Sequence, residues 1–232
     1  MRSSRAIIFF VRSESDERRH KPLPRIHGQR PEYRAVNRAL LSRLRPALRN
    51  ADLVIASTGK VASIEGEEQI LQRGSTFGER ICSAAADTFA LGYREVIIVG
   101  NDCPDIEATD ITAAFALLQK GSDVVAAPAR DGGAFLIGLT AGGFSPDWFR
   151  SLPWQTSDLF DLLTALPEAE ALPICRDDFD SWRGYDATIA LAQLLNLSDR
   201  GIESIDSIPF HFSFRQRKAI TRSWLPAPPS FH

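Results

Sequence analysis

The sequence predicts an α/β protein in which a mostly parallel β-sheet is covered by helices on both faces, giving a three-layer α/β/α arrangement. Short apolar runs bounded by turn residues recur along the chain. Amphipathic helical stretches lie between them, which is typical of βαβ units. The chain has 232 residues, 44% of them hydrophobic, and can therefore bury one substantial core.

Five apolar runs are the clearest strand candidates, because each is followed by turn residues and is rich in side chains that favour sheets. The fifth follows the fourth after a very short loop. A further short strand is expected near residues 171–174. The five runs span residues 6–11, 52–57, 95–100, 123–128 and 134–139.

Helical periodicity predicts the connections between these strands. Residues 31–50 and 77–91 each place their apolar side chains on one stripe. The helix after the third strand has Thr109 or Asp110 as its expected N-cap, and Lys120-Gly121 is a good C-terminal signal. Two later helices are expected at about residues 156–165 and 186–195.

The segment 12–30 directly follows the first strand and shows neither the helical nor the strand period. It contains Pro22, Pro24 and Gly28, so we predict a long loop. Long ordered loops in compact domains are usually functional.

We expect one domain over residues 1–200 and an appended C-terminal extension over residues 201–232. The extension alternates apolar and polar residues at 208–214 and ends in a proline-rich tail. Its strand could pair with the chain's own sheet or with the sheet edge of a partner, in which case a homodimer would form.

No apolar run approaches the length needed to span a bilayer. The three cysteines, Cys82, Cys103 and Cys175, are odd in number and far apart, which indicates neither a disulfide framework nor a zinc site. A cytoplasmic location is therefore expected.

Charge is unevenly distributed. Residues 1–50 carry a net charge of +9, whereas the rest carries −11. The basic segment could bind the phosphates of a nucleotide or of nucleic acid, or it could be a solvated helix face. We favour the solvated face for Arg34, Arg38, Arg45 and Arg49, and nucleic-acid binding is the least favoured interpretation.

Ligands of open parallel sheets bind beyond the carboxyl ends of the strands, so polar residues at those ends are the first site candidates. Asp102 follows the third strand and could hold Mg²⁺ or Mn²⁺, although a turn residue or helix cap is the alternative interpretation. Asp131-Gly132-Gly133 could be a hairpin turn, a ligand-binding loop, or both. The start of the second helix, with Gly78 and Arg80, could hold an anion.

Other chemistries lack their patterns. The four histidines have no metal-ligand spacing, no serine lies in a G-x-S-x-G context, and the glycines match neither the P-loop nor the dinucleotide fingerprint. No basic and aromatic RNA-binding motif is found either.

Four segments resemble a bacterial glycosyltransferase-like family of the radical-SAM/selenodomain-associated transferase type, which is similar to nucleotide-diphospho-sugar transferases of the GT-A fold. The resemblance covers roughly residues 70–195. The segments are QRGSTFGERI at 72–81, EVIIVGNDCPDI at 95–106, DVVAAPARDGGAFLIGL at 123–139 and PWQTS at 153–157. The resemblance implies a GT-A type of fold.

The resemblance also implies roles for particular residues. Asp102 would handle the metal and the nucleotide diphosphate. Asp131, Gly132 and Gly133 would border the acceptor or sugar pocket. Trp154, Thr156 and Ser157 would shape the far wall, although Trp154 could equally be a core residue. Asp178 or Asp180 would be a second metal ligand.

The chain departs from the family where the family has Lys-Thr-Arg-Leu after the first strand. It has Lys21-Pro22-Leu23-Pro24-Arg25 there, and Ala134-Phe135 replaces the usual tyrosine after the glycine pair. Arg12, Lys21 and Arg25 could still neutralise a diphosphate.

The leading hypothesis is a transferase that depends on Mg²⁺ or Mn²⁺ and moves a sugar or nucleotidyl group from a nucleotide or nucleotide sugar to an unknown acceptor, with Asp131 as a general base. The alternative is a catalytically silent relative that serves as a binding or scaffolding module.

Overall fold

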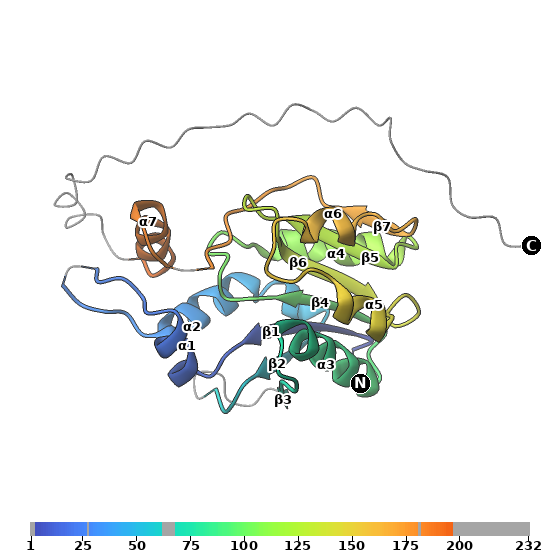
Figure 1. The fold of residues 1–232 in the computed structure, drawn as a ribbon, viewed down its shortest axis with the longest axis horizontal. Coiled ribbons are helices and arrows are strands. Elements are labelled where there is room, and N and C mark those ends of the chain that lie inside the picture. The colour runs from blue at the N-terminus through green and yellow to red at the C-terminus, as the bar shows by residue number, and fades with distance from the viewer. Residues whose placement is uncertain (1–2, 27, 62–67, 181, 197–232) are drawn as a thin grey trace, which may run out of the picture.

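A seven-stranded β-sheet forms the centre of the computed structural model, which describes residues 3–26, 28–61, 68–180 and 182–196 (Figure 1). The strand order is β3-β2-β1-β4-β6-β5-β7, and β6 is antiparallel to both its neighbours while the other pairs are parallel. The strands are β1 (Arg5–Val11), β2 (Asp52–Ser57), β3 (Glu68–Leu71), β4 (Glu95–Val99), β5 (Val124–Pro128), β6 (Ala134–Thr140) and β7 (Ala169–Ala171).

Helices cover both faces of this sheet, as Figure 1 shows. Alternation along β1 divides the core, since Ile7 and Phe9 face α2, α4 and α7 while Ala6 and Ile8 face α3, α5 and α6. The predicted three-layer α/β/α fold is confirmed. The helices are α1 (Glu14–His20), α2 (Tyr33–Leu44), the 3-10 turn η1 (Ala47–Arg49), α3 (Phe77–Ala90), α4 (Ala108–Gln119), α5 (Pro146–Ser151), α6 (Leu159–Leu163) and α7 (Tyr185–Leu194).

Each of the five long strand predictions is confirmed to within one residue at either end. The short strand predicted near 171–174 lies at Ala169–Ala171 instead. The helix predicted over 31–50 ends at Leu44, because Pro46 lacks the N–H that would continue it, and η1 follows. The helix predicted at 156–165 is shorter, spanning Leu159–Leu163.

The N-cap of α4 is Glu107 rather than Thr109 or Asp110. Asp110 instead occupies the third helical position, where its carboxylate accepts a hydrogen bond from the Glu107 N–H at 2.9 Å. The two side chains form a reciprocal capping box, and α4 ends at Gln119, with Lys120 as its C-cap and Gly121 following at φ +110°.

The prediction of a loop throughout residues 12–30 is wrong, because α1 forms there. Ser13 caps the helix by accepting from the Asp16 N–H, the first turn is acidic and the last turn is basic, which suits the helix dipole. The buried side chain of α1 is Glu17. A helix without an apolar stripe gives no periodic signal.

Two elements besides α1 were not predicted. Strand β3 lies at one edge of the sheet with mostly exposed side chains, so it lacks the alternation of a half-buried strand. Helix α5 is only six residues long and begins at Pro146.

Several other expectations concern exposure and the ends of the chain. The stripe formed by Arg34, Arg38, Arg45 and Arg49 is exposed, as predicted for a solvated face. All three cysteines are free.

Among the described helices, none combines the length and apolar character that crossing a membrane requires. The extension at 201–232, with its predicted strand at 208–214, falls outside the described residues.

Candidate functional site

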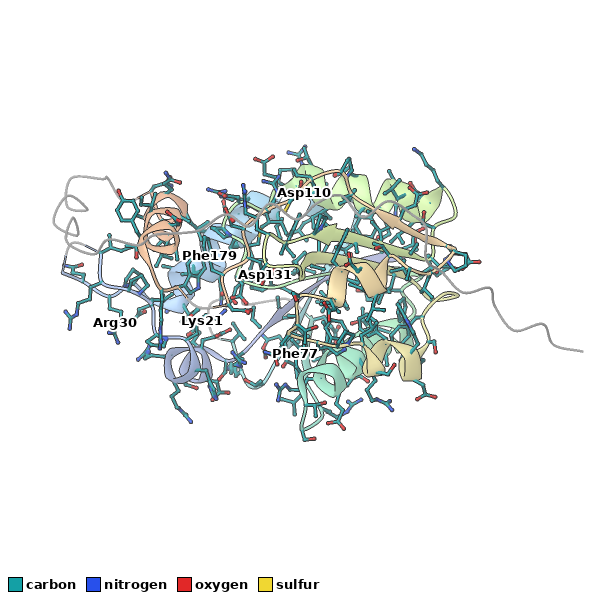
Figure 2. The ribbon with its side chains drawn as sticks, turned by 45° about the horizontal axis from the view of Figure 1, so that its top comes forward. Lys21, Arg30, Phe77, Asp110, Asp131 and Phe179 are labelled. Atoms are coloured by element: carbon teal, nitrogen blue, oxygen red, sulfur yellow. The ribbon has the colours of Figure 1, made fainter. Side chains whose placement is uncertain are left out.

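A cavity of about 510 Å³ opens beyond the carboxyl ends of β1 and β4. Strand β1 lies between β2 and β4 in the sheet, so the order of strands reverses at β1 and β4. Ligands of open α/β sheets bind at such reversal points. The antiparallel strand β6 begins at the same edge. Figure 2 shows Lys21, Asp131 and Phe179 in this region, whereas Arg30 lies away from it.

Lys21 joins three segments of the cavity wall. Its buried ammonium group donates hydrogen bonds to Asp102 Oδ1 and, at 3.2 Å, to the backbone carbonyl of Phe179. The Phe179 N–H donates to the Asp102 carbonyl at 2.9 Å. The hydroxyl of Tyr33 donates to the Lys21 carbonyl at 2.5 Å, and burial raises the pKa of Tyr33, so it remains a donor. The segment after α1 is thereby fixed to the end of β4.

Five carboxylates line the cavity, and four of them, besides Glu17, are aspartates: Asp102, Asp131, Asp178 and Asp180. Burial, followed by the negative charge of Asp102, raises the pKa of both Asp178 and Asp180. Asp178 Oδ1 is buried and has no hydrogen-bond partner among the described residues. Burial and mutual repulsion therefore both disfavour the charged forms of these two carboxylates.

The segment that carries Asp178 and Asp180 is held in place from the side of β5. Arg176 forms two hydrogen bonds with the buried carboxylate of Asp110, at 2.7 and 2.9 Å. Its N–H donates to the Pro128 carbonyl at 3.3 Å and its own carbonyl accepts from the Arg130 N–H at 3.1 Å. These bonds attach the acidic segment to the end of β5.

A buried polar network next to Lys21, formed by Glu17, Asn37 and Asn101, was not predicted from the sequence. Glu17 Oε1 accepts from the Arg12 N–H and from Asn101 Nδ2, both at 3.3 Å, and Asn101 Nδ2 also donates to Asn37 Oδ1 at 3.2 Å. Burial, and secondly the charge of Asp102, raises the pKa of Glu17. The available signal was the four-residue spacing of Glu17 and Lys21, which is the spacing of neighbours on a helix face; Lys21 is the C-cap residue of α1.

Among the predicted phosphate-binding cations, Arg12, Lys21 and Arg80 line the cavity. The Arg12 Nη1 atom lies 3.6 Å from Glu17 Oε2, and Arg80 Nη1 donates to the Ser75 carbonyl at 3.3 Å. Arg25 does not line the cavity, because its side chain is exposed and donates to the Gly28 carbonyl at 2.9 Å.

Gly78 and Gly132 also lie outside the cavity lining and serve close packing. A Cβ at Gly78 would lie 2.6 Å from Trp154 Cδ1, and a Cβ at Gly132, where φ is +95°, would lie 2.9 Å from Ser157 Cα. Both glycines therefore let the turn at residues 153–157 approach. Trp154 is a wall residue and a packing residue at once, since its indole contacts Phe77 and its N–H donates to the Phe149 carbonyl at 2.9 Å.

The Asp131-Gly132-Gly133 segment is the turn of the β5–β6 hairpin. The Gly133 N–H donates to Oδ1 of the exposed Asp131 carboxylate at 2.9 Å. Asp131 and Gly133 line the cavity together with Trp154, Thr156 and Ser157. The hairpin turn therefore also borders the cavity.

The fold and the position of the cavity define a protein of the nucleotide-diphospho-sugar transferase type of α/β fold. Residues 50–156 match a family described as uncharacterized proteins conserved in bacteria (DUF2064). A protein from Desulfovibrio desulfuricans G20, assigned as a nucleotide-diphospho-sugar transferase, superposes with a TM-score of 0.63 and 24% identity over 84% of this chain and 97% of its own. The resemblance stated from the sequence motifs is confirmed.

Two further similarities concern nucleotidyltransferases. CMP:2-keto-3-deoxy-manno-octonic acid synthetase, solved with CTP, superposes with a TM-score of 0.55 and 12% identity over 84% of this chain and 98% of its own. The 3-phospho-D-glycerate guanylyltransferase of Phenylobacterium zucineum (strain HLK1) is 34% identical over 68 residues, which are 29% of this chain and 31% of the relative. The chain thus matches about a third of this curated relative's length.

Proposed function

We propose that the chain is a transferase that uses Mg²⁺ or Mn²⁺ to act on a nucleotide-activated substrate and moves a glycosyl or nucleotidyl group. One observation carries this proposal: the cavity at the switch point of the sheet is lined by opposed acidic and basic side chains. Carboxylates can bind a cation there and the basic groups can bind phosphates, within one enclosure.

The charge balance of the cavity supports the need for a cation. The lining contains five acidic side chains against three basic ones, Arg12, Lys21 and Arg80. A nucleoside diphosphate would add further negative charge. Since like charges at close range are strongly unfavourable in a partly buried site, a divalent ion would be required for tight binding.

The residues present fit such an ion. Within the described part of the chain, no group of three or more histidine, cysteine or acidic side chains is arranged to hold a metal. Mg²⁺ however usually needs only one or two protein carboxylates, with phosphate and water as its other ligands. We propose Asp102 and Asp180 for this role, because both are carboxylates of the lining with hard oxygen donors. When bound, the ion would offset the charge of the diphosphate.

The chain's own residues would act on the rest of the substrate. Lys21 would release Asp102 and direct its ammonium group to a phosphate oxygen, with Arg12 beside it. Arg80 would contact the phosphates from the start of α3. Asp131 is exposed, and among the described residues only its Oδ1 accepts a hydrogen bond, so it can accept a proton from an acceptor hydroxyl as a general base.

One observation favours the catalytically silent alternative. The ammonium group of Lys21 already occupies Asp102 and would compete with a metal ion. A binding module without catalysis would keep this ion pair. The open cavity, still lined by Asp102, Asp131 and basic side chains, supports the transferase instead.

A thermal-shift screen tests the proposal. Nucleoside di- and triphosphates and nucleotide sugars are added with and without Mg²⁺ or Mn²⁺ to the wild type and to Asp102→Ala. We expect a metal-dependent rise in melting temperature that Asp102→Ala abolishes. No shift with any ligand would favour the silent alternative.

A further inference from the structure

Gln155 has an unusual backbone in the turn between α5 and α6. Its φ is +63°, a left-handed value that, among the described non-glycine residues, recurs only at Asn196, where φ is 53°. Gln155 lines the cavity and Asn196 does not. Residues other than glycine rarely adopt this backbone conformation, and those that do concentrate at ligand sites.

Contacts on both sides of Gln155 maintain this backbone. The Trp154 N–H donates to the Leu152 carbonyl at 2.8 Å, and the Thr156 hydroxyl donates to the Pro153 carbonyl at 2.7 Å. The turn is further confined by its close approach to Gly78 and Gly132. The Gln155 side chain itself is exposed, with no hydrogen-bond partner in the described part of the chain.

The chemistry of this wall indicates which part of a substrate it would meet. Gln155 and Ser157 present an amide and a hydroxyl at exposed positions of the cavity, whereas the Thr156 hydroxyl is already bonded to the Pro153 carbonyl. The indole of Trp154 is packed between Phe77 and Phe149, at ring centroid distances of 5.6 and 4.9 Å. The polar side chains of this wall therefore offer hydrogen bonds to a substrate, while the Trp154 ring is held by its aromatic neighbours.

We propose that Gln155 selects the non-nucleotide partner of the reaction, by a hydrogen bond from its carboxamide to a hydroxyl or carboxylate of the sugar or hydroxy-acid group. A carboxamide both donates and accepts while remaining neutral, so it suits either group. The phosphates are assigned to Arg12, Lys21 and Arg80. The metal is assigned to Asp102 and Asp180, so none of these groups comes from the turn at residues 153–157. This inference rests on the proposed function, since it assumes that the nucleotide occupies the same cavity.

Three variants of the full chain separate binding from backbone effects. Gln155→Gly removes the amide and relieves the left-handed backbone. Gln155→Asn keeps an amide and tolerates that backbone. Asn196→Gly gives the same backbone relief away from the cavity. The measurement is calorimetric titration of GTP and CTP with Mg²⁺, followed by titration of 3-phospho-D-glycerate and glucose 1-phosphate into the nucleotide-saturated protein.

For Gln155→Gly we expect the Kd of at least one of the two acceptor probes to rise by about fivefold to tenfold, the effect of one lost hydrogen bond. The nucleotide Kd should stay within about twofold, a change too small for a lost hydrogen bond, and the melting temperature should not fall. Gln155→Asn should recover part of the acceptor affinity, and Asn196→Gly should change neither Kd.

Two outcomes would overturn the inference while leaving the proposed function intact: nucleotide binding with no effect of Gln155→Gly on either acceptor probe, or weaker nucleotide binding by the same factor as acceptor binding. Failure of both nucleotides and both probes to bind the wild type would overturn the proposed function together with this inference.

Discussion

Replacing Gly132 by alanine tests whether the β5–β6 turn packs on the turn at residues 153–157 as the structure shows. The new Cβ would overlap the Ser157 carbonyl and lie 2.9 Å from Ser157 Cα, and φ at Gly132 is +95°. The left-handed backbone costs about 1–2 kcal/mol for an L-residue. Overpacking costs about 1–3 kcal/mol more. The stiffer unfolded chain returns about 0.4–1 kcal/mol, so we expect a net loss of about 2–4 kcal/mol.

Two matched glycines separate these contributions. Gly92 has φ +98° but nothing within 4 Å of an added Cβ, so Gly92→Ala should lose only about 1 kcal/mol, the backbone cost alone. Gly142 has neither a positive φ nor a neighbour within 4 Å, so Gly142→Ala should be neutral or stabilising by up to about 1 kcal/mol.

Urea unfolding with linear extrapolation measures the free energy of unfolding of each variant. In a thermal melt, each kcal/mol corresponds to about 2–4 °C for a domain of this size. If Gly132→Ala is no more destabilised than Gly92→Ala, the close contact with Ser157 does not exist. The confinement of the wall around Gln155 would then be refuted as well.

Further predictions concern three charged groups. Arg176→Ala should lower the free energy of unfolding by about 3–5 kcal/mol, because it leaves the buried Asp110 carboxylate without its cation. Arg130→Ala breaks an exposed pair and should cost no more than about 1 kcal/mol. Equal losses of the two variants in urea unfolding would contradict this prediction. Burial raises the pKa of Glu17 above 4.5, so the folded state holds this proton more tightly than the unfolded chain. Its contribution to stability is therefore present below pH 4.5 and is lost as pH rises through the raised pKa. Glu17→Gln should remove this loss when the free energy of unfolding is measured against pH. An unchanged pH profile of the free energy of unfolding would contradict the prediction. Hydrogen bonds from Thr76 and Ser75 lower the pKa of Glu79 to about 2, so its contribution is present above pH 4.5 and is lost as pH falls towards 2. Glu79→Ala should show a shallower loss of melting temperature over that range, and the same acid loss as in the wild type would contradict this assignment.

The sequence predicted most strongly those elements whose burial is periodic. β1 and β4 are apolar runs of near-complete burial, and their bounds were predicted to within one residue. α1 was missed because its buried side chain is the charged Glu17. β3 was missed because an exposed edge strand needs no apolar face. Capping stabilises the backbone of α1, and pairing with β2 stabilises that of β3. Neither contact leaves a hydrophobic period in the sequence.

The candidate site also contains residues that the sequence could locate and contacts that it could not. Asp102 and Asp131 could be located because they follow strands, and the ends of neighbouring strands meet at one edge of the sheet. The contacts of Gly78 and Gly132 could not be predicted. The residues that pack against a glycine are distant from it in the sequence, and the glycine itself does not indicate which they are. The Glu17–Asn101 bond likewise joins residues 84 positions apart.

Isothermal titration of Mg²⁺-GTP and Mg²⁺-CTP into the wild type and Asp102→Asn, repeated with EDTA, tests the central claim that the cavity binds a nucleotide through a divalent ion at Asp102. We expect one of the two nucleotides to bind the wild type only with Mg²⁺, and Asp102→Asn to weaken that binding by about tenfold or more, as for the loss of a charged partner. Binding that is equally tight in EDTA and in Asp102→Asn would contradict the claim.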